Sequence, residues 1–147
     1  MKGSIYILLP FLLFSSRLKA DTIVVDQKSN VPTLTKAITL ASAGDTILVR
    51  AGHYREGNVR ITIPLTIIGQ GQAVFDGENK YEIFTISSDH VTIEGLSFVD
   101  TGTASMNDVA AIKVEKGTDI TIRDNKFNDT FFGIHFSNSS ASLVENN

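Results

Sequence analysis

The sequence predicts an all-β fold, a right-handed single-stranded parallel β-helix with a short capping helix at its N-terminal end. Three observations predict it. Short β-branched segments return at intervals of roughly two dozen residues, within the range of repeat periods that marks stacked architectures. A polar turn with Gly or Asn follows each copy, and a second alternating strand lies between copies. Each coil of such a solenoid buries its apolar side chains only when the next coil stacks on it.

The repeated segments are near copies of one tripeptide: Leu65-Thr66-Ile67, Val91-Thr92-Ile93, Ile120-Thr121-Ile122 and, more weakly, Leu143-Val144. Ile67 and Ile93 are 26 residues apart, and Ile93 and Ile122 are 29 apart. We expect these isoleucines to lie in one column, because parallel coils place equivalent residues over one another. Hairpins of a β-sandwich would need two-residue turns such as Asn-Gly or Asp-Gly, and only Asp76-Gly77 qualifies.

The second strand of each coil supplies further inward pairs: Phe84/Ile86, Ile112/Val114 and Ile134/Phe136. At the corners, Asn tolerates left-handed backbone and its amide can bond to an Asn one coil away, so Asn125 is expected to stack on Asn147. Four phenylalanines are predicted to form a stacked aromatic core, and an exposed subset would instead offer a sugar-stacking platform: Phe127, Phe131, Phe132 and Phe136.

One helix is predicted near residues 34–43. Thr33 is a suitable N-cap, the apolar residues from Leu34 to Ala41 follow helical spacing, and Gly44 is placed to end the helix in a left-handed conformation. This helix is expected to cover the first coil. About four coils are predicted in residues 21–147, and because the sequence stops inside a turn, we expect this domain to be the N-terminal part of a longer, C-terminally truncated β-helix.

Residues 1–20 predict a signal peptide. Lys2 precedes the apolar run 5–14, and Leu18 and Ala20 fit a cleavage site after Ala20. An uncleaved membrane anchor is the alternative, but spanning a bilayer takes about 20 apolar residues. The chain has no Cys and a formal net charge of −3, which becomes −3 − 3 = −6 after loss of three basic residues with the leader. These features favour an acidic periplasmic protein, and the absence of a basic cluster argues against nucleic-acid binding.

The segment 44–57, GDTILVRAGHYREG, resembles the opening motif "GDTIxVxxGxYxEG" of many bacterial β-helix proteins. Three later segments extend the resemblance: 65–71, 91–96 and 132–136. Together with the signal peptide, they make the chain similar to the NosD family, the periplasmic β-helix accessory proteins of nitrous oxide reductase maturation. The same opening occurs in the broader group of carbohydrate-binding and sugar-hydrolase β-helices.

The NosD resemblance implies a non-catalytic role in assembling the copper–sulfide centre of the reductase. Its implied partners are the ATPase and membrane subunits of an ABC transporter and a copper-chaperone lipoprotein. Two other functions stay open. One is a carbohydrate-active β-helix, acting as a polysaccharide lyase, a hydrolase or a sugar-binding module. The other is a structural or adhesive solenoid.

Two sets of residues are candidates for chemistry. Imidazole and thioether groups suit copper, and the mature chain offers His53, His90, His135 and Met106. His135 alternates with two apolar residues and is expected to face outward, which makes it the best exposed of the four. The carbohydrate alternative points to an acidic patch of Asp124 and Asp129 beside Arg123. Asp is also what β-helix corners require without any activity, so both interpretations of the patch remain open.

Overall fold

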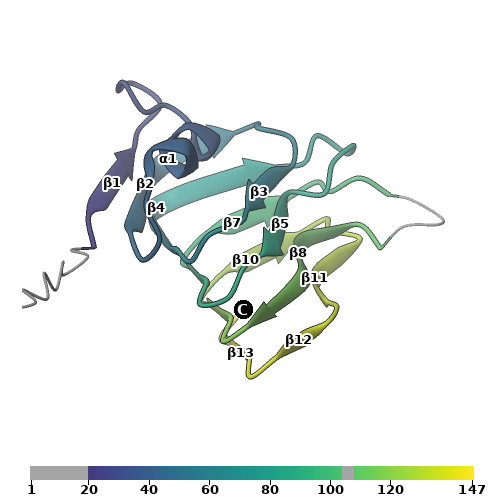
Figure 1. Ribbon diagram of the computed structural model, residues 1–147. Coiled ribbons are helices and arrows are strands. Elements are labelled where there is room, and N and C mark those ends of the chain that lie inside the picture. Colours follow the sequence, from purple (N-terminus) through teal and green to yellow (C-terminus); the bar gives the residue numbers. More distant parts are fainter. Residues whose placement is uncertain (1–19, 104–107) are drawn as a thin grey trace, which may run out of the picture.

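The computed structural model describes residues 20–103 and 108–147, which form a parallel β-helix of about five turns (Figure 1). The predicted signal peptide, apart from Ala20, lies outside the described residues, and so does Met106. Among the described residues, no helix is long and apolar enough to cross a membrane.

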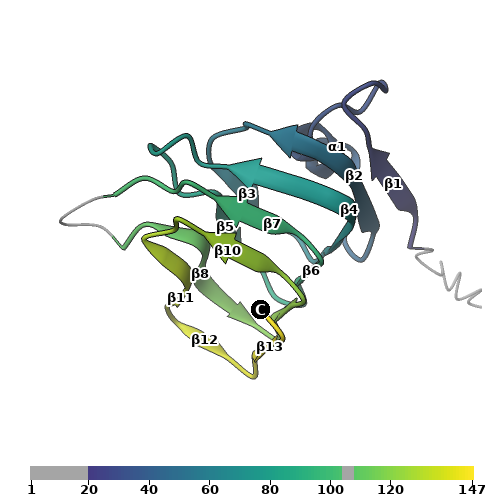
Figure 2. The same cartoon turned by 180° about the vertical axis from the view of Figure 1, so that it is seen from behind.

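The larger sheet takes one parallel strand from each successive coil. Its order is β1 (Thr22–Val25), β2 (Thr46–Tyr54), β4 (Thr66–Asp76), β6 (Thr92–Glu94), β9 (Thr121–Arg123) and β13 (Leu143–Glu145). Past a corner, the second half of β4 pairs with β7 (Ser97–Val99), which pairs in turn with β10 (Lys126–Asn128). Figure 2 shows β4, β7 and β10 side by side on this wall.

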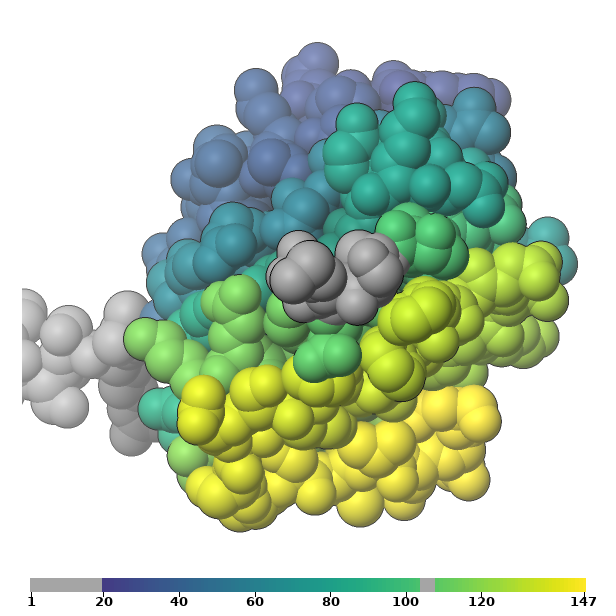
Figure 3. Space-filling view, turned by 90° about the vertical axis from the view of Figure 1, so that its right-hand side faces the viewer, coloured from purple at the N-terminus to yellow at the C-terminus, as the bar shows by residue number. Residues whose placement is uncertain are grey.

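The smaller sheet closes the other side of each coil. It contains β3 (Val59–Ile61), β5 (Phe84–Ser87), β8 (Ala110–Thr118) and β11 (Phe132–Phe136), with β12 (Ser139–Ser140) paired to the end of β8. The coils follow one another in chain order along the solenoid, as the colour sequence in Figure 3 shows.

The predicted isoleucine column is confirmed. Ile67 pairs in register with Ile93, and Ile93 with Ile122, and all three are fully buried. The second-strand columns are confirmed as well, with Phe84 on Ile112 and Ile86 on Val114. Alternation along each strand sends every second side chain into the core. The parallel in-register stacking then turns each apolar position into a continuous column.

The number of coils is larger than predicted. Residues 22–25 form a first rung, in which Ile23 lies beside Ile47, and Ile47 lies beside Ile67. The spacings are 24 and 20 residues, close to those of the later copies. The segment was missed because it has no copy before it and directly follows the predicted signal peptide.

Helix α1 (Leu34–Leu40) is shorter than predicted, and the predicted stop at Gly44 is wrong. Ala41 is already extended, with ψ 151°. Gly44 does have a positive φ of 90°, but it lies in a turn closed by a bond from the Asp45 N–H to the Ser42 carbonyl. The Asp45 carboxylate also accepts the Ser42 N–H, which holds the chain out of the helical path. The capping role is confirmed, because Leu34 and Ala37 are buried and α1 packs on β1, β2 and β3.

Glu56 caps this helix from the next coil. Its carboxylate accepts the backbone N–H groups of Leu34 and Thr35, both at 2.8 Å, and the Thr35 hydroxyl at 2.7 Å. These are N-terminal amides that have no partner within the helix, and the helix dipole adds to the attraction for a carboxylate.

Replacing Glu56 with alanine is expected to lower the free energy of unfolding by about 1–2 kcal/mol, the usual cost of a lost N-terminal cap. Urea unfolding followed by far-UV circular dichroism measures it. Glu56→Gln keeps one acceptor oxygen, so its free energy of unfolding is expected to lie between those of the native protein and Glu56→Ala. The exposed Lys36→Ala change in the same helix serves as the control and is expected to stay within about 0.5 kcal/mol. A Glu56→Ala midpoint equal to that of the control would show that the cap contributes nothing.

The aromatic core differs from the prediction. Stacked rings run through four coils in the order Tyr54, Phe75, Phe98 and Phe127, with centroid separations of 5.1, 6.1 and 5.4 Å. Of the predicted set, Phe127 joins this stack and Phe136 packs on the core, but Phe131 and Phe132 are 49% and 41% exposed. They lie in the fifth coil, which no further described coil covers. The register of β7 and β10, not the local richness in phenylalanine, selects the stacked rings.

Candidate functional site

The main wall of the solenoid bends at one corner, where each of three successive coils has a left-handed residue. Gly71, Gly95 and Asp124 have φ values of 80°, 68° and 56°. The backbones approach closely beside them, since a Cβ added to Gly69 would lie 2.2 Å from the Gly95 carbonyl oxygen. Glycine is the residue that permits both the positive φ and the close approach. The outer side of this corner is hollowed by a pocket.

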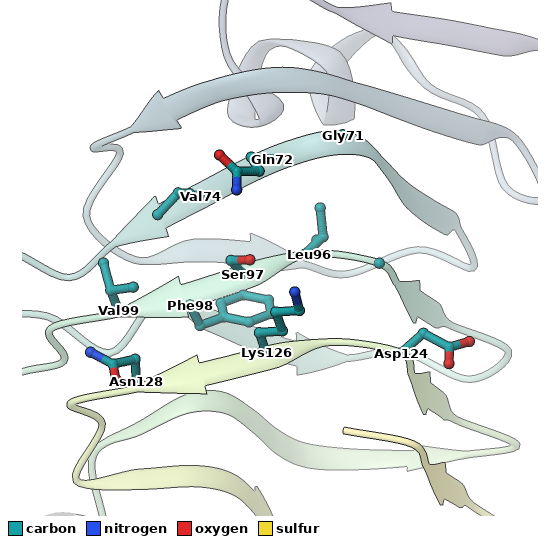
Figure 4. A pocket seen from close by; sticks show the side chains of 11 residues that line it. Gly71, Gln72, Val74, Leu96, Ser97, Phe98, Val99, Asp124, Lys126 and Asn128 are labelled. Atoms are coloured by element: carbon teal, nitrogen blue, oxygen red, sulfur yellow. The ribbon is translucent and has the colours of Figure 1, made fainter.

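A groove of about 500 Å³ follows the corner across β4, β7 and β10 (Figure 4). Its polar side chains come from three successive coils: Gln72, Ser97, Asp124, Lys126 and Asn128. Val74 and Val99 supply apolar surface between them. Ser97 and Lys126 are directly paired in register, so their side chains leave the same face of neighbouring strands.

Most of these polar side chains have no partner among the described residues. Gln72, Ser97 and Lys126 make no side-chain hydrogen bond or ion pair there, whereas the Asn128 amide donates to Asp129 at 2.6 Å. The sequence analysis missed the first three. A signal was present, because Ser97 and Lys126 each follow the last Ile of the repeated tripeptide by four residues.

The acidic patch is not assembled as a catalytic pair. Asp124 and Asp129 occupy the two ends of β10 and have positive φ values of 56° and 50°, which confirms the interpretation as corner residues. At about 3.3 Å per residue, the intervening strand separates them by more than about 10 Å. Paired carboxylates of glycosidases lie about 5 to 9.5 Å apart. Arg123 is held by Glu94, with its Nε at 3.0 Å and a terminal nitrogen at 2.8 Å, and this hydrogen bond raises the pKa of Arg123.

Each described histidine pairs with an aspartate of a neighbouring coil. His53 Nε2 lies 2.7 Å from Asp76, and His90 Nδ1 lies 2.9 Å from Asp119. The three histidines lie on different parts of the solenoid: β2, the corner before β6, and β11. The described residues contain no group of three or more His, Cys, Asp or Glu side chains able to hold a metal ion. The three described histidines thus do not lie together in one metal site.

His135 is the least exposed of the three, so its selection as the best exposed candidate is wrong. Its side chain is 28% exposed, against 50% for His53 and 68% for His90. Nε2 lies 3.5 Å from Asp108, while Nδ1 is buried with no hydrogen-bond partner in the described part of the chain. His135 pairs in register with Lys113 of the previous coil, and its ring lies near the Phe132 ring, with centroids 6.2 Å apart.

Asp76 joins two coils through one carboxylate. Its Oδ2 accepts from Arg55 at 3.0 Å and contacts His53, and its Oδ1 accepts the Glu78 N–H at 2.7 Å. Burial by itself would raise the pKa of Asp76, but the hydrogen bonds from His53, the Glu78 amide and Arg55 outweigh it and lower the pKa to about 2. The sequence analysis took Asp76-Gly77 for turn geometry, and the ion-pair role depends on contacts between coils that the local sequence does not show.

The lowered pKa makes stability depend on acid. The stabilisation is fully present above the ordinary Asp pKa of 3.8 and is lost as pH falls from about 4 towards about 2. Lowering the pKa of Asp76 from 3.8 to about 2 corresponds to a stabilisation of roughly 2 kcal/mol. We expect Asp76→Asn to lower the unfolding free energy at pH 7 and to flatten its decline between pH 4 and pH 2. Asp129 is an exposed corner residue and serves as the control. If Asp129→Asn changed stability in the same way, the stabilising role of the Asp76 ion pairs would be contradicted.

Fold and groove together define a β-solenoid protein of the parallel β-helix class with a polar groove along its outer corner. Comparisons with protein-family models, curated proteins and solved structures found no match to the chain.

Proposed function

We propose that the chain is a periplasmic accessory protein that helps to assemble the copper centre of nitrous oxide reductase together with an ABC transporter and a copper chaperone. The observation that carries the proposal is the opening motif, residues 44–57, on which the NosD resemblance chiefly rests. Three of its defining residues, Asp45, Tyr54 and Glu56, have specific roles in the first coils of the solenoid.

Asp45 accepts the N–H groups of Ser42 and Asp21 and so ties the first rung to the second. Tyr54 starts the aromatic stack, and its hydroxyl donates to the Arg50 carbonyl at 2.8 Å. Glu56 caps helix α1. A motif whose acidic and aromatic residues tie together the N-terminal end of the β-helix supports a structural resemblance and not merely a match of a few letters.

In this proposal the solenoid is a docking scaffold, and copper is cargo carried between the partners. Stacked rungs give a rigid, continuous surface, and extended surfaces of this kind are how solenoids bind other proteins. His53 and His90 are exposed, and each has one ring nitrogen held by a carboxylate, an arrangement that orients a histidine for metal contact. They are the residues that a copper-carrying partner would meet.

The test is made in a bacterium that reduces nitrous oxide. Deleting the gene for this chain is expected to leave a reductase deficient in copper, and restoring the gene is expected to recover copper content and nitrous oxide consumption. Growth on oxygen serves as the control for general fitness. A reductase with its full copper content in the deletion strain would contradict the proposed role in copper-centre assembly.

A further inference from the structure

The threonines of the repeated tripeptide form a row on the outside of the larger sheet. Each directly precedes an inward-facing isoleucine, so its own side chain points away from the core. In-register pairing continues this row through five successive coils: Thr22, Thr46, Thr66, Thr92 and Thr121. A second row stands two residues further along the same strands: Val24, Leu48, Ile68, Glu94 and Arg123. We call these two rows the threonine face.

The threonine face is regular. Its strands pair without a register shift, because the shift between β2 and β4 comes only after Arg50. Neighbouring strands lie about 4.8 Å apart and successive residues about 3.3 Å apart, so the hydroxyls recur about every 4.8 Å and the two rows are about 6.6 Å apart. Threonine is β-branched and has few rotamers, which limits the movement of each hydroxyl and methyl group.

The chemistry of the threonine face is neutral. The row threonines make no side-chain hydrogen bond among the described residues, whereas the Thr35 and Thr39 hydroxyls donate to groups of their own chain. Glu94 and Arg123 are the charged members of the face, and they bond to each other at 3.0 and 2.8 Å. The face therefore offers hydroxyl and methyl groups without an unpaired charge, and it does not suit an ionic ligand.

The size of the face argues against a protein partner. Five strands about 4.8 Å apart span about 20 Å, and two rows with their side chains cover about 10 Å, which gives roughly 200 Å². A stable protein complex buries about 800 Å² on each partner. A second copy of this chain would find too little area on this face. A growing crystal needs less, because many bound molecules act on its surface together and the advancing lattice surrounds each of them.

Ice is an uncharged, periodic surface that matches this array. A threonine hydroxyl both donates and accepts hydrogen bonds, as a water molecule does, so it can take the place of a lattice water. Methyl groups order the water next to them and fit the open spaces of the lattice. The repeat of ice along one of its axes is close to the spacing of the strands, so successive threonines can meet equivalent lattice positions. Ice also excludes ions, which agrees with the neutrality of the face.

We propose that the threonine face binds ice, with the hydroxyls of the row in the positions of lattice waters and the methyl and aliphatic groups against the lattice. The proposal stands apart from the role in copper-centre assembly, because it depends on different residues and a different ligand. The failure of either leaves the other untouched.

The test is the partition of the full chain between slowly growing ice and the remaining liquid, with the protein in both fractions measured by absorbance. The native chain is expected to concentrate in the ice. Thr66→Lys places a charged group in the middle of the row and is expected to reduce the partition about tenfold or more, because the ammonium would have to leave liquid water. Thr66→Ser keeps the hydroxyl and is expected to retain part of the binding.

Ser97→Lys is the matched control. Ser97 is half-buried on the outer wall of β7, as Thr66 is on β4, but it lies past the corner and outside the threonine face. It is expected to leave the partition unchanged. Thermal unfolding of each variant checks that it folds, and Thr46→Lys repeats the test on the next rung if Thr66→Lys does not.

Four results would overturn the proposal. The first two are exclusion of the native chain from the ice and an equal loss with Ser97→Lys. The third is a dimer in sedimentation velocity that Thr66→Lys dissociates, which would assign the face to a second copy. The fourth is binding to crystalline cellulose with the same dependence on Thr66, which would assign it to a polysaccharide surface.

Discussion

Replacing Phe98 with alanine is expected to lower the free energy of unfolding by about 3–5 kcal/mol, the range for deleting a fully buried aromatic ring. Phe98 is fully buried and lies in the middle of the aromatic stack. It stacks on Phe75 of the previous coil and on Phe127 of the next, and it meets Phe84 edge-to-face at 5.0 Å. The variant loses apolar burial and also the coupling between three consecutive coils, because solenoid stability depends on the interfaces between neighbours.

Urea unfolding followed by the far-UV circular dichroism of the strands measures this loss, since the chain has no Trp to report by fluorescence. Phe131→Ala is the matched control, because that ring is half exposed and lies outside the stack. It is expected to cost less than about 1 kcal/mol. Equal losses for Phe98→Ala and Phe131→Ala would show that the stack does not hold the coils together.

Much of this architecture can be predicted from the sequence because the signal repeats. Copies of one tripeptide, with β-branched residues at Ile67, Ile93 and Ile122, specify both the strand and its partner. A shift of one residue in register would turn a whole row of apolar side chains out of the core, so the alternation also fixes the pairing. The same logic correctly places Phe84 over Ile112.

What could not be predicted depends on contacts between distant parts of the chain. Helix α1 ends early because the Asp45 carboxylate binds the Ser42 N–H and holds the chain out of the helical path. The helical spacing of apolar residues in the sequence continues past the observed end of the helix. Phe131 and Phe132 look like core residues by composition, but their exposure depends on which coil lies above them. The partial burial of His135 beside Lys113 likewise follows from the order of the coils.

The groove also depends on contacts between coils that the local sequence does not show. Gln72, Ser97 and Lys126 are ordinary surface residues in the sequence, and they come together only when three coils bring them to one corner. Of the residues that attracted attention by type, Asp129 and the histidines proved to be corner residues or members of inter-coil pairs, and Asp124, a corner residue, also lines the groove. Residue type predicts corner chemistry well in such a fold, and it predicts a binding site poorly.

The Asn125 amide is expected to be the second essential stabilising group. Its oxygen accepts the Leu96 N–H at 3.0 Å, and its nitrogen donates to the Ile93 carbonyl at 3.1 Å and to the Asn147 side chain at 2.9 Å. The Asn147 amide repeats the pattern one coil later with a bond to the Ile122 carbonyl at 2.9 Å, which confirms the predicted Asn ladder. Asn125 is 2% exposed, so water cannot replace these bonds.

Asn125→Ala is expected to lower the free energy of unfolding by about 2–4 kcal/mol, because it leaves the Leu96 amide and the Ile93 carbonyl buried without partners. Asn128→Ala removes an exposed asparagine from the same strand region and is the control, with an expected effect within about 0.5 kcal/mol. Equal unfolding midpoints for the two variants would mean that the hydrogen bonds of the Asn ladder contribute nothing to stability.

Asn125→Asp separates hydrogen bonding from shape. The introduced carboxyl has nearly the size of the amide, but when ionised it places negative charge against the Ile93 carbonyl without a donor to offer. Burial and this contact raise its folded-state pKa, so the folded protein binds the proton more tightly than the unfolded chain. Stability relative to the native sequence is therefore expected to recover as pH falls through the folded-state pKa, when the protonated carboxyl can donate again. Chemical unfolding of both proteins from pH 7 to pH 4 measures the difference, and a gap that stays constant with pH would contradict the donor role of the Asn125 amide.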